Sequence, residues 1–227
     1  MRTLRPIAFD EALTISYVVQ PMPVFARRAH LQSTYRFWCD CSRCTHEAQL
    51  CDPAATAAVE RAWELVQSGA AERSAGDAGN AEALYREALT LVSGSGSQSE
   101  TRHHDGSGAA VRALAYEGLA RVALSDHRWR AAISMLERSF ENGCGRGCPQ
   151  DGGRWQGSTD HLEGLRAAEI WRLQTRLGDS VAAKPWAELG MAALRRTHGC
   201  DSAALSSLAK ELAAAAQNEP AGSAEVS

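Results

Sequence analysis

The sequence predicts a mostly α-helical protein in which a short β segment and a group of cysteines precede an array of helical hairpins. Three observations lead to this fold class. β-branched and aromatic residues alternate with others in residues 13–19, and three thiols lie within residues 39–44. After Pro53 the chain is rich in alanine, leucine, glutamate and arginine, and no strand pattern returns. With 227 residues, the chain is long enough to bury the core of one large domain or two small ones.

Composition and charge exclude several classes of function. Lys and Arg number 24 against 27 Asp and Glu, a net charge of −3, whereas sequence-independent nucleic-acid binding requires a basic face. No apolar run is long enough to span a bilayer, and residues 1–12 carry four charges without the apolar core of a secretory signal. We therefore expect a protein of the cytoplasm or nucleus, where the seven cysteines are thiols or metal ligands rather than disulfides.

The first fifty residues combine a strand, a helix and a cysteine-rich turn. Residues 13–19 (Leu-Thr-Ile-Ser-Tyr-Val-Val) follow an acidic turn and read as a strand that Pro21 and Pro23 end. An amphipathic stretch predicts a short helix from Val24 to Tyr35. We expect Trp38, which follows this helix, in the core beneath the cysteines.

Cys39, Cys41 and Cys44 form a C-x-C-x-x-C pattern, called here the cysteine cluster. Three soft ligands within six residues allow one turn to wrap a tetrahedral zinc ion. A closed structural site needs a fourth ligand, which is His46, Cys51 or a residue outside this chain. If His46 or Cys51 completes the site, residues 35–51 form a free-standing zinc knuckle. The alternative is a set of incidental thiols beside the start of a helix.

The remainder of the chain is predicted to be helical, starting at Pro53 with Asp52 as the N-cap. Its segments are a first helical hairpin at 51–92, a Gly/Ser-rich linker at 93–108, a helical domain at 109–217 with a Gly-rich loop at 142–160, and a disordered tail at 218–227.

A faint repeat runs through the helical part. After each of three short turns, small, large and small residues occupy one helical face: Ala81, Tyr85 and Ala88; Ala132, Leu136 and Ser139; Ala182, Trp186 and Leu189. Stacked helical hairpins interlock through such positions, and the units resemble degenerate tetratricopeptide (TPR) repeats. The alternative is that alanine-rich amphipathic helices show this spacing by chance.

The order of parts in the first fifty residues resembles the end of a SET domain and its post-SET zinc segment. An acidic turn, a Leu-Thr-Ile-Ser-Tyr strand, a helix, Tyr-Arg-Phe-Trp and C-x-C-x-x-C follow one another, and a helical array comes next. Together they are similar to the SET-and-MYND (SMYD) group of protein-lysine methyltransferases. Such enzymes use S-adenosylmethionine, and the resemblance implies the same chemistry on a lysine of a protein substrate.

Carried over to this sequence, the resemblance assigns a role to each aromatic residue. Tyr17 corresponds to the active-site tyrosine, Tyr35 to a wall of the lysine channel, and Phe37 to the residue beside the cofactor's adenine. The cysteine cluster corresponds to three structural zinc ligands. Methyl transfer needs the amine aligned behind the sulfonium methyl group, and aromatic faces tolerate a cationic lysine.

The cofactor-binding motif of this family has no counterpart in the sequence. In this family an Asn-His-Ser-Cys motif binds S-adenosylmethionine and also supplies the fourth zinc ligand. No Asn-His pair is present in this sequence. We therefore expect the carboxy-terminal part of a SMYD-like protein, inactive in methyl transfer by itself. The alternative is a non-catalytic, TPR-like interaction module with a structural zinc segment, which binds a peptide or a chaperone partner.

Overall fold

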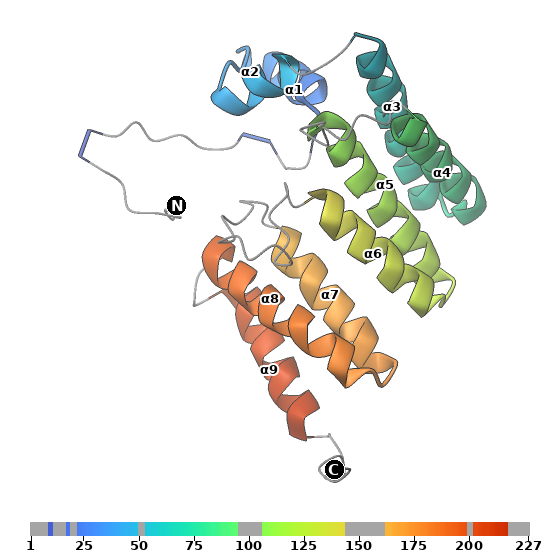
Figure 1. The fold of residues 1–227 in the computed structure, drawn as a ribbon, viewed down its shortest axis with the longest axis vertical. Helices are drawn as coiled ribbons and strands as arrows, with labels where there is room; N and C mark the ends of the chain where they lie inside the picture. The colour runs from blue at the N-terminus through green and yellow to red at the C-terminus, as the bar shows by residue number, and fades with distance from the viewer. Residues whose placement is uncertain are drawn as a thin grey trace. The chain divides into compact units, whose positions relative to one another are not determined.

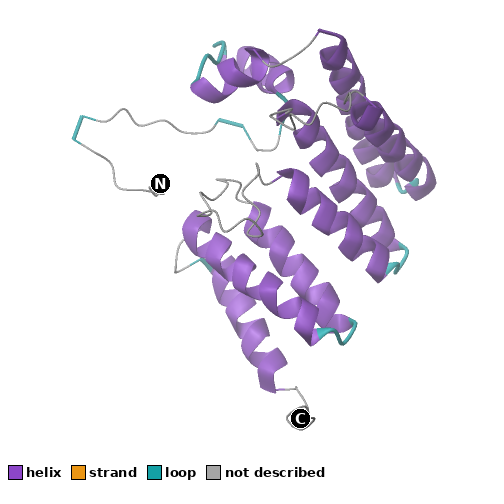
Figure 2. Cartoon of the chain, in the orientation of Figure 1, coloured by secondary structure: helices purple, strands orange, loops and turns teal. Residues whose placement is uncertain are grey.

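A computed structural model of the chain describes residues 9–10, 17–18, 22–49, 53–94, 106–143, 162–198 and 202–217. Helix accounts for 87% of these residues and none of them belongs to a strand, so the mostly helical fold class is confirmed (Figure 2). The strand expected at residues 13–19 lies outside this part of the chain except for Tyr17 and Val18, which have no regular secondary structure.

The described residues form nine helices, labelled in Figure 1. Their bounds are α1 Val24–Tyr35, α2 Ser42–Gln49, α3 Pro53–Ala75, α4 Ala78–Gly94, α5 Gly106–Ser125, α6 Trp129–Gly143, α7 Leu162–Arg176, α8 Ser180–His198 and α9 Ala203–Gln217. Helices α1–α6 belong to one compact unit and α7–α9 to another.

The helix bounds expected at the start of the chain are confirmed. Helix α1 covers Val24–Tyr35, and α3 begins at Pro53. Helix α2 was not expected, and α5 begins at Gly106, inside the predicted linker. Three predicted segments lie outside the described residues: the rest of the linker (95–105), the Gly-rich loop beyond the end of α6 (144–160) and the tail (218–227).

The same turn joins the helices of all three hairpins, α3–α4, α5–α6 and α7–α8. Gly76, His127 and Gly178 have positive φ angles of 92°, 56° and 79°. In each turn this residue donates its N–H to the carbonyl three residues back at 3.0–3.2 Å, and the next residue donates to the carbonyl five back at 2.8–3.0 Å. These bonds satisfy the last carbonyls of the first helix. Glycine adopts the left-handed conformation without steric cost, which explains two of the three residues.

Each turn also fixes the phase of the helix that follows it. The residue after the left-handed one is Asp77, Arg128 or Asp179, and buried residues lie four, eight and eleven positions beyond it. They are Ala81, Tyr85 and Ala88; Ala132, Leu136 and Ser139; Ala183, Ala187 and Gly190. The third set predicted from sequence (Ala182, Trp186 and Leu189) is wrong by one residue, since all three are half-buried. The cap explains the error, because Asp179 Oδ1 accepts the N–H of Ala182 at 3.0 Å and sets the register.

Apolar clusters among the described residues pack the helices within each unit. In the first unit, twelve buried apolar side chains of α3, α4 and α5 form one cluster, centred on the ring of Tyr85. In the second unit, Trp171 of α7 and Leu194 of α8 pack with Leu208 of α9. Burial of this kind, at about 25 cal/mol per Å² of apolar surface, is the main stabilising force between the helices.

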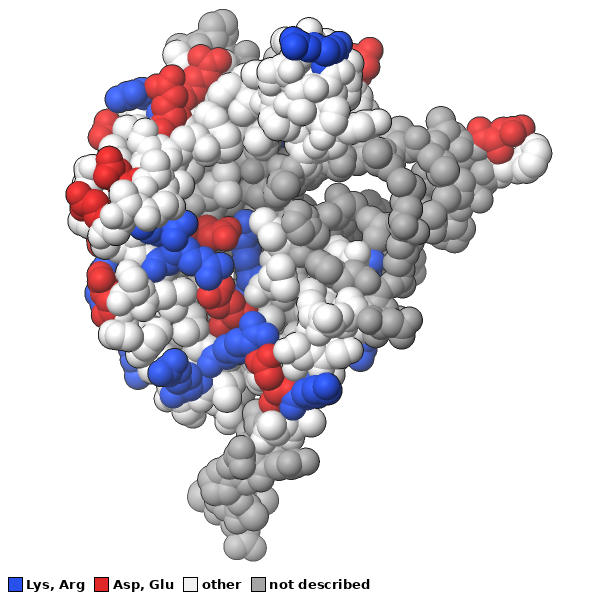
Figure 3. All heavy atoms as spheres, turned by 180° about the vertical axis from the view of Figure 1, so that it is seen from behind, with Lys and Arg blue, Asp and Glu red and all other residues white. Residues whose placement is uncertain are grey.

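Charged side chains of both signs are mixed on the surface. Figure 3 shows acidic and basic residues interspersed on the face seen from behind, so the described side chains of that face form no basic stripe for a nucleic-acid backbone. None of the described helices has the length and apolar character needed to cross a membrane.

Candidate metal centre

Helix α1 is anchored to the hairpins at its first turn. The Val24 N–H donates to Ser107 Oγ of α5 at 3.3 Å in a buried position, and Phe25 packs against the apolar cluster of α3–α5. Val24, Arg27 and Leu31 share the buried face of α1. The helix ends where Arg36 takes a left-handed conformation (φ 62°), which turns the chain toward the cysteine cluster.

The three sulfur atoms of the cysteine cluster lie within 4.8 Å of one another. Cys44 is buried in the first turn of α2, Cys39 is half-buried and Cys41 is exposed. The Thr45 N–H donates to Cys41 O at 2.9 Å and Thr45 Oγ1 donates to Asp40 O at 3.0 Å, so the turn is held in place. Tetrahedral zinc with bonds of about 2.3 Å places thiolate sulfurs about 3.8 Å apart. The cluster therefore could hold a metal ion and is compatible with zinc.

A buried arginine stands behind the cluster. Arg27 is only 3% exposed, and its guanidinium donates to Cys44 Sγ at 3.6 Å, to Glu47 Oε2 at 2.8 Å and to the carbonyl of Met22. Burial acts to lower the pKa of Arg27, but the charge of Glu47 and the hydrogen bonds to Cys44 and Glu47 raise it overall. Arg27 therefore stays cationic and presents a positive charge to the sulfur.

Burial raises the pKa of the Cys44 thiol, and the hydrogen bond and charge of Arg27 oppose this rise. A thiol must lose its proton to bind zinc, and the cation itself supplies most of the electrostatic stabilisation of the thiolate. A metal cation would therefore stabilise the thiolate of the buried Cys44, and the Arg27 guanidinium donates a hydrogen bond to the same sulfur. This donor set fits a structural metal.

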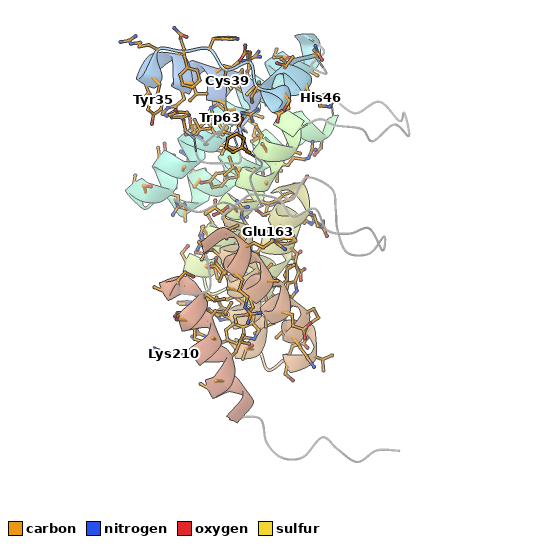
Figure 4. All side chains as sticks on the ribbon, turned by 90° about the vertical axis from the view of Figure 1, so that its left-hand side faces the viewer. Tyr35, Cys39, His46, Trp63, Glu163 and Lys210 are labelled. Atoms are coloured by element: carbon orange, nitrogen blue, oxygen red, sulfur yellow. The ribbon has the colours of Figure 1, made fainter. Side chains whose placement is uncertain are left out.

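The fourth ligand is not settled by the described residues. His46, labelled in Figure 4, lies in α2 but does not belong to the group of mutually close ligand atoms. Cys51, the other candidate, lies outside the described part of the chain, as do Cys144, Cys148 and Cys200. The geometry therefore gives three ligands and leaves one coordination position to another group.

Three aromatic residues meet beside the cluster. The ring centroid of Tyr17 lies 5.2 Å from that of Tyr35 and 5.5 Å from that of Phe37, in tilted and edge-to-face orientations. Such orientations leave part of each ring face open, and all three side chains are partly exposed to solvent. We call Tyr17, Tyr35 and Phe37 the aromatic cluster. It brings together residues that are distant in the sequence, since Tyr17 lies 18 positions before Tyr35.

The expectation for Trp38 is wrong. Its side chain is 61% exposed rather than in the core. The guanidinium of Arg28 stacks 5.0 Å from the centre of its ring, and Arg28 Nε donates to Cys39 O at 3.0 Å. An aromatic side chain can remain at the surface when a cation covers one face, and here the stack links α1 to the cysteine cluster.

Sequence reasoning missed Arg27 and Glu47. The signal was present, because Arg27 occupies the same helical face as Val24 and Leu31, where an unpaired charge is not tolerated. A charged residue on an apolar stripe indicates a buried partner, which here is a glutamate in a helix that sequence analysis did not predict.

Comparison with known proteins gives no assignment. No protein-family model matches the chain, and no curated protein matches it. The functional argument therefore depends on the residues and their geometry.

Proposed function

We propose that residues 17–44 form the lysine-binding end and the zinc-held post-SET segment of a SMYD-like protein-lysine methyltransferase. The observation that carries the proposal is the aromatic cluster. The resemblance assigns Tyr17 to the active-site tyrosine, Tyr35 to a wall of the lysine channel and Phe37 to the residue beside the cofactor's adenine. The ring centroids of Tyr35 and Phe37 lie 5.2 and 5.5 Å from that of Tyr17.

The chemistry of the cluster suits a lysine side chain. Aromatic faces attract an ammonium group and pack against its aliphatic stem, and the Tyr17 hydroxyl could accept a hydrogen bond that orients the amine. The zinc has a structural role in this proposal: it fixes the segment that carries Tyr35 and Phe37. The cluster thus binds and orients the nucleophile, which is the part of methyl transfer that depends on positioning.

S-adenosylmethionine would supply an electrophilic methyl group, and Phe37 alone among the described residues is assigned to it. One aromatic face does not hold a charged nucleoside cofactor, so the described residues support the lysine-binding and zinc parts of the proposal only.

The test is binding of a lysine side chain to the full chain. Nα-acetyl-lysine amide is titrated into ¹⁵N-labelled wild type, Tyr17→Phe and the matched control Tyr116→Phe, with Nα-acetyl-norleucine amide as the uncharged probe. We expect saturable amide shifts at Tyr35 and Phe37 with the lysine probe, weakened at least threefold in Tyr17→Phe and unchanged in Tyr116→Phe. No saturable shift with the lysine probe, or equal binding of the norleucine probe, would overturn the proposal.

We propose a second function for the hairpins, TPR-like binding of an extended peptide. It is favoured by the repeated turns and by buried residues at the same three positions of each second helix, and within the first unit the α3–α4 hairpin packs against α5. An array of peptides of varied sequence, probed with the full chain, tests it. The expected result is a subset of peptides that bind and that compete with one another; binding to none rejects the second function.

A further inference from the structure

Cys41 and Cys44 lie at the two ends of the first turn of α2. The Cys41 carbonyl accepts the N–H of Thr45 at 2.9 Å, and because α2 begins at Ser42, Cys41 is the N-cap residue of this helix. Cys44 follows three positions later, and residues with this spacing are neighbours on one face of a helical turn. Local helix geometry therefore brings the two side chains together.

The sulfur atoms of the cysteine cluster are close enough to react with one another. All three lie within 4.8 Å of each other, and none of them is in a disulfide. A disulfide bond is about 2.0 Å long and joins cysteines whose Cα atoms are about 4.4–6.8 Å apart. Rotation of the two side chains in the first turn of α2 closes the remaining gap.

Cys41 and Cys44 differ in their access to solvent. Cys41 is exposed, whereas Cys44 is only 2% exposed and its Sγ accepts a hydrogen bond from Arg27 at 3.6 Å. A dissolved oxidant reaches an exposed sulfur first, and a neighbouring thiol then attacks the oxidised sulfur. The turn therefore holds both parts of a redox pair, an accessible thiol and a resolving thiol whose position is fixed.

Cys39 is less suited to either part. It is half-buried, and its carbonyl accepts the Nε–H of Arg28 at 3.0 Å, so its backbone is tied to α1 rather than to α2 (Figure 4). Only one residue separates it from Cys41, and a disulfide between them would close a smaller and more strained ring. The geometry therefore favours a bond between Cys41 and Cys44.

We propose that Cys41 and Cys44 form a redox pair that a hydroperoxide converts to a disulfide. The Cys41 sulfur attacks the peroxide, so that an S–O bond forms, the O–O bond breaks, and water or an alcohol leaves. The Cys44 sulfur then attacks the sulfenic acid of Cys41, which forms the S–S bond and releases water. The two thiols lose two protons and two electrons, and the peroxide takes up all four. A dithiol reverses the reaction by thiol–disulfide exchange.

The disulfide changes what the cysteine cluster can bind. A structural metal in this position needs thiolate ligands, and the disulfide removes two of the three sulfurs that could hold it. Oxidation therefore releases the metal, and reduction allows it to bind again. The inference goes beyond both proposed functions, because it concerns the thiols whether or not the chain binds a lysine or a peptide.

The test follows the bond and the metal together in the full chain. Zinc-loaded protein is treated with hydrogen peroxide, released zinc is measured with a chromophoric chelator, and the remaining thiols are alkylated. Cleavage after Arg43, before Asp40 and after Glu47 places each thiol of the cluster in its own fragment, separate from Cys51, so mass spectrometry identifies the linked pair.

We expect a link between Cys41 and Cys44, zinc release that keeps pace with it, and reversal of both by dithiothreitol. Three results would each overturn the proposal: a different pair that predominates, oxidation of the cluster to sulfinic acids without a disulfide, or zinc that stays bound in the linked protein.

Variants assign the part of each thiol, and they are compared with wild type in metal-free form because each lacks a metal ligand. Cys41→Ser should lower disulfide formation in the cluster at least tenfold, since the accessible thiol is gone. Cys39→Ser should form the bond between Cys41 and Cys44 within about twofold of the wild-type rate. Cys148→Ser removes a thiol outside the cluster and is the control. Wild-type disulfide formation in Cys41→Ser, or its loss in Cys39→Ser, contradicts the assignment.

The outcomes separate the redox pair from the proposed functions. A disulfide between Cys41 and Cys44 in a protein that gives no shift with the lysine probe supports the redox pair and rejects lysine binding. Lysine binding in a protein that forms no such disulfide rejects the redox pair and leaves the first proposed function standing.

Discussion

The segment of α1 and α2 and the neighbouring stack of α3–α5 are stabilised by different interactions. Among the described residues, α1 and α2 bury the side chains of Val24, Leu31 and Cys44 together with the charge of Arg27. The stack of α3–α5 buries twelve apolar side chains in one cluster. The stack thus has a large apolar core of its own, whereas α1 and α2 combine a few apolar contacts, including Phe25 against the stack, with polar contacts around the Cys44 sulfur.

This difference indicates where a metal is needed. Segments too small to bury an apolar core are commonly held by a metal or by disulfides. The three thiols lie in the segment with the smaller core, and the buried Arg27–Glu47 pair is costly to desolvate unless its surroundings are fixed. We therefore expect changes at the cysteine cluster to affect α1 and α2 strongly and the stack hardly at all.

Loss of the cluster should have the largest effect. Cys44→Ser, or removal of metal by a chelator, should lower the zinc content at least tenfold, since the binding energy of a structural zinc is also folding energy. Amide hydrogen exchange in α1 and α2 should accelerate while exchange in α3–α5 stays protected. Cys148→Ser is the matched control and should keep its zinc. Full protection of α2 in metal-free Cys44→Ser would show that the metal is not structural.

Replacement of Arg27 should have the next largest effect. Arg27→Met removes the donors to Cys44 Sγ and leaves Glu47 without its ion pair, so zinc affinity should fall about 10–100-fold. Competition with a chromophoric chelator measures the affinity. The double variant Arg27→Met/Glu47→Leu removes the stranded charge and should restore the helicity of α2 but not the zinc affinity. Wild-type affinity in a folded Arg27→Met protein would exclude this role.

In the stack, the expected effect is on packing. Gly118→Ala forces a methyl group into the ring of Tyr85 and should lower the free energy of unfolding by about 1–3 kcal/mol. Gly79→Ala is the matched control, because only Asp77 Oδ1 lies within 4 Å of its new Cβ, at 3.8 Å, and it should stabilise α4 by about 0.4–1 kcal/mol. Urea denaturation measures both, and zinc content should not change in either. Equal stability of the two variants would contradict the packing around Tyr85.

The parts predicted from the sequence are those set by local chemistry. The bounds of α1 and the start of α3 follow from prolines and amphipathic spacing, and the cysteine cluster follows from three thiols within six residues. Features that depend on contacts between distant segments were not predicted. Arg27 finds Glu47 across twenty residues, and Trp38 remains exposed because Arg28 covers it. The assignment of Tyr17 and Phe37 came from resemblance and stays a prediction, and its agreement with the ring contacts is the reason to test it first.

The smallest expected effect on stability comes from the ion pair of Arg172 and Glu211 in the second unit. It joins an arginine to a glutamate, as the Arg27–Glu47 pair does, but it is exposed to solvent. Arg172 of α7 donates to Glu211 of α9 at 2.6 and 3.0 Å, and these hydrogen bonds lower the pKa of Glu211. A lowered carboxyl pKa in the folded state contributes stability above the ordinary pKa of glutamate, and this stability is lost as pH falls through the lowered value. Because Arg172 and Glu211 are 45% and 37% exposed, we expect less than about 1 kcal/mol at neutral pH, reduced further by salt.

The variants Arg172→Gln and, as control, Lys210→Gln resolve this effect. Exchange of the α9 amides, measured from neutral pH into acid, should show a deficit in protection for Arg172→Gln at neutral pH that shrinks as pH falls through the lowered pKa of Glu211. Lys210→Gln should follow wild type throughout. A deficit that persists in acid would mean that Arg172 acts through the packing of its aliphatic stem rather than through its charge. The contrast with the Arg27–Glu47 pair, which acts through charge in a buried position, would then be wider still.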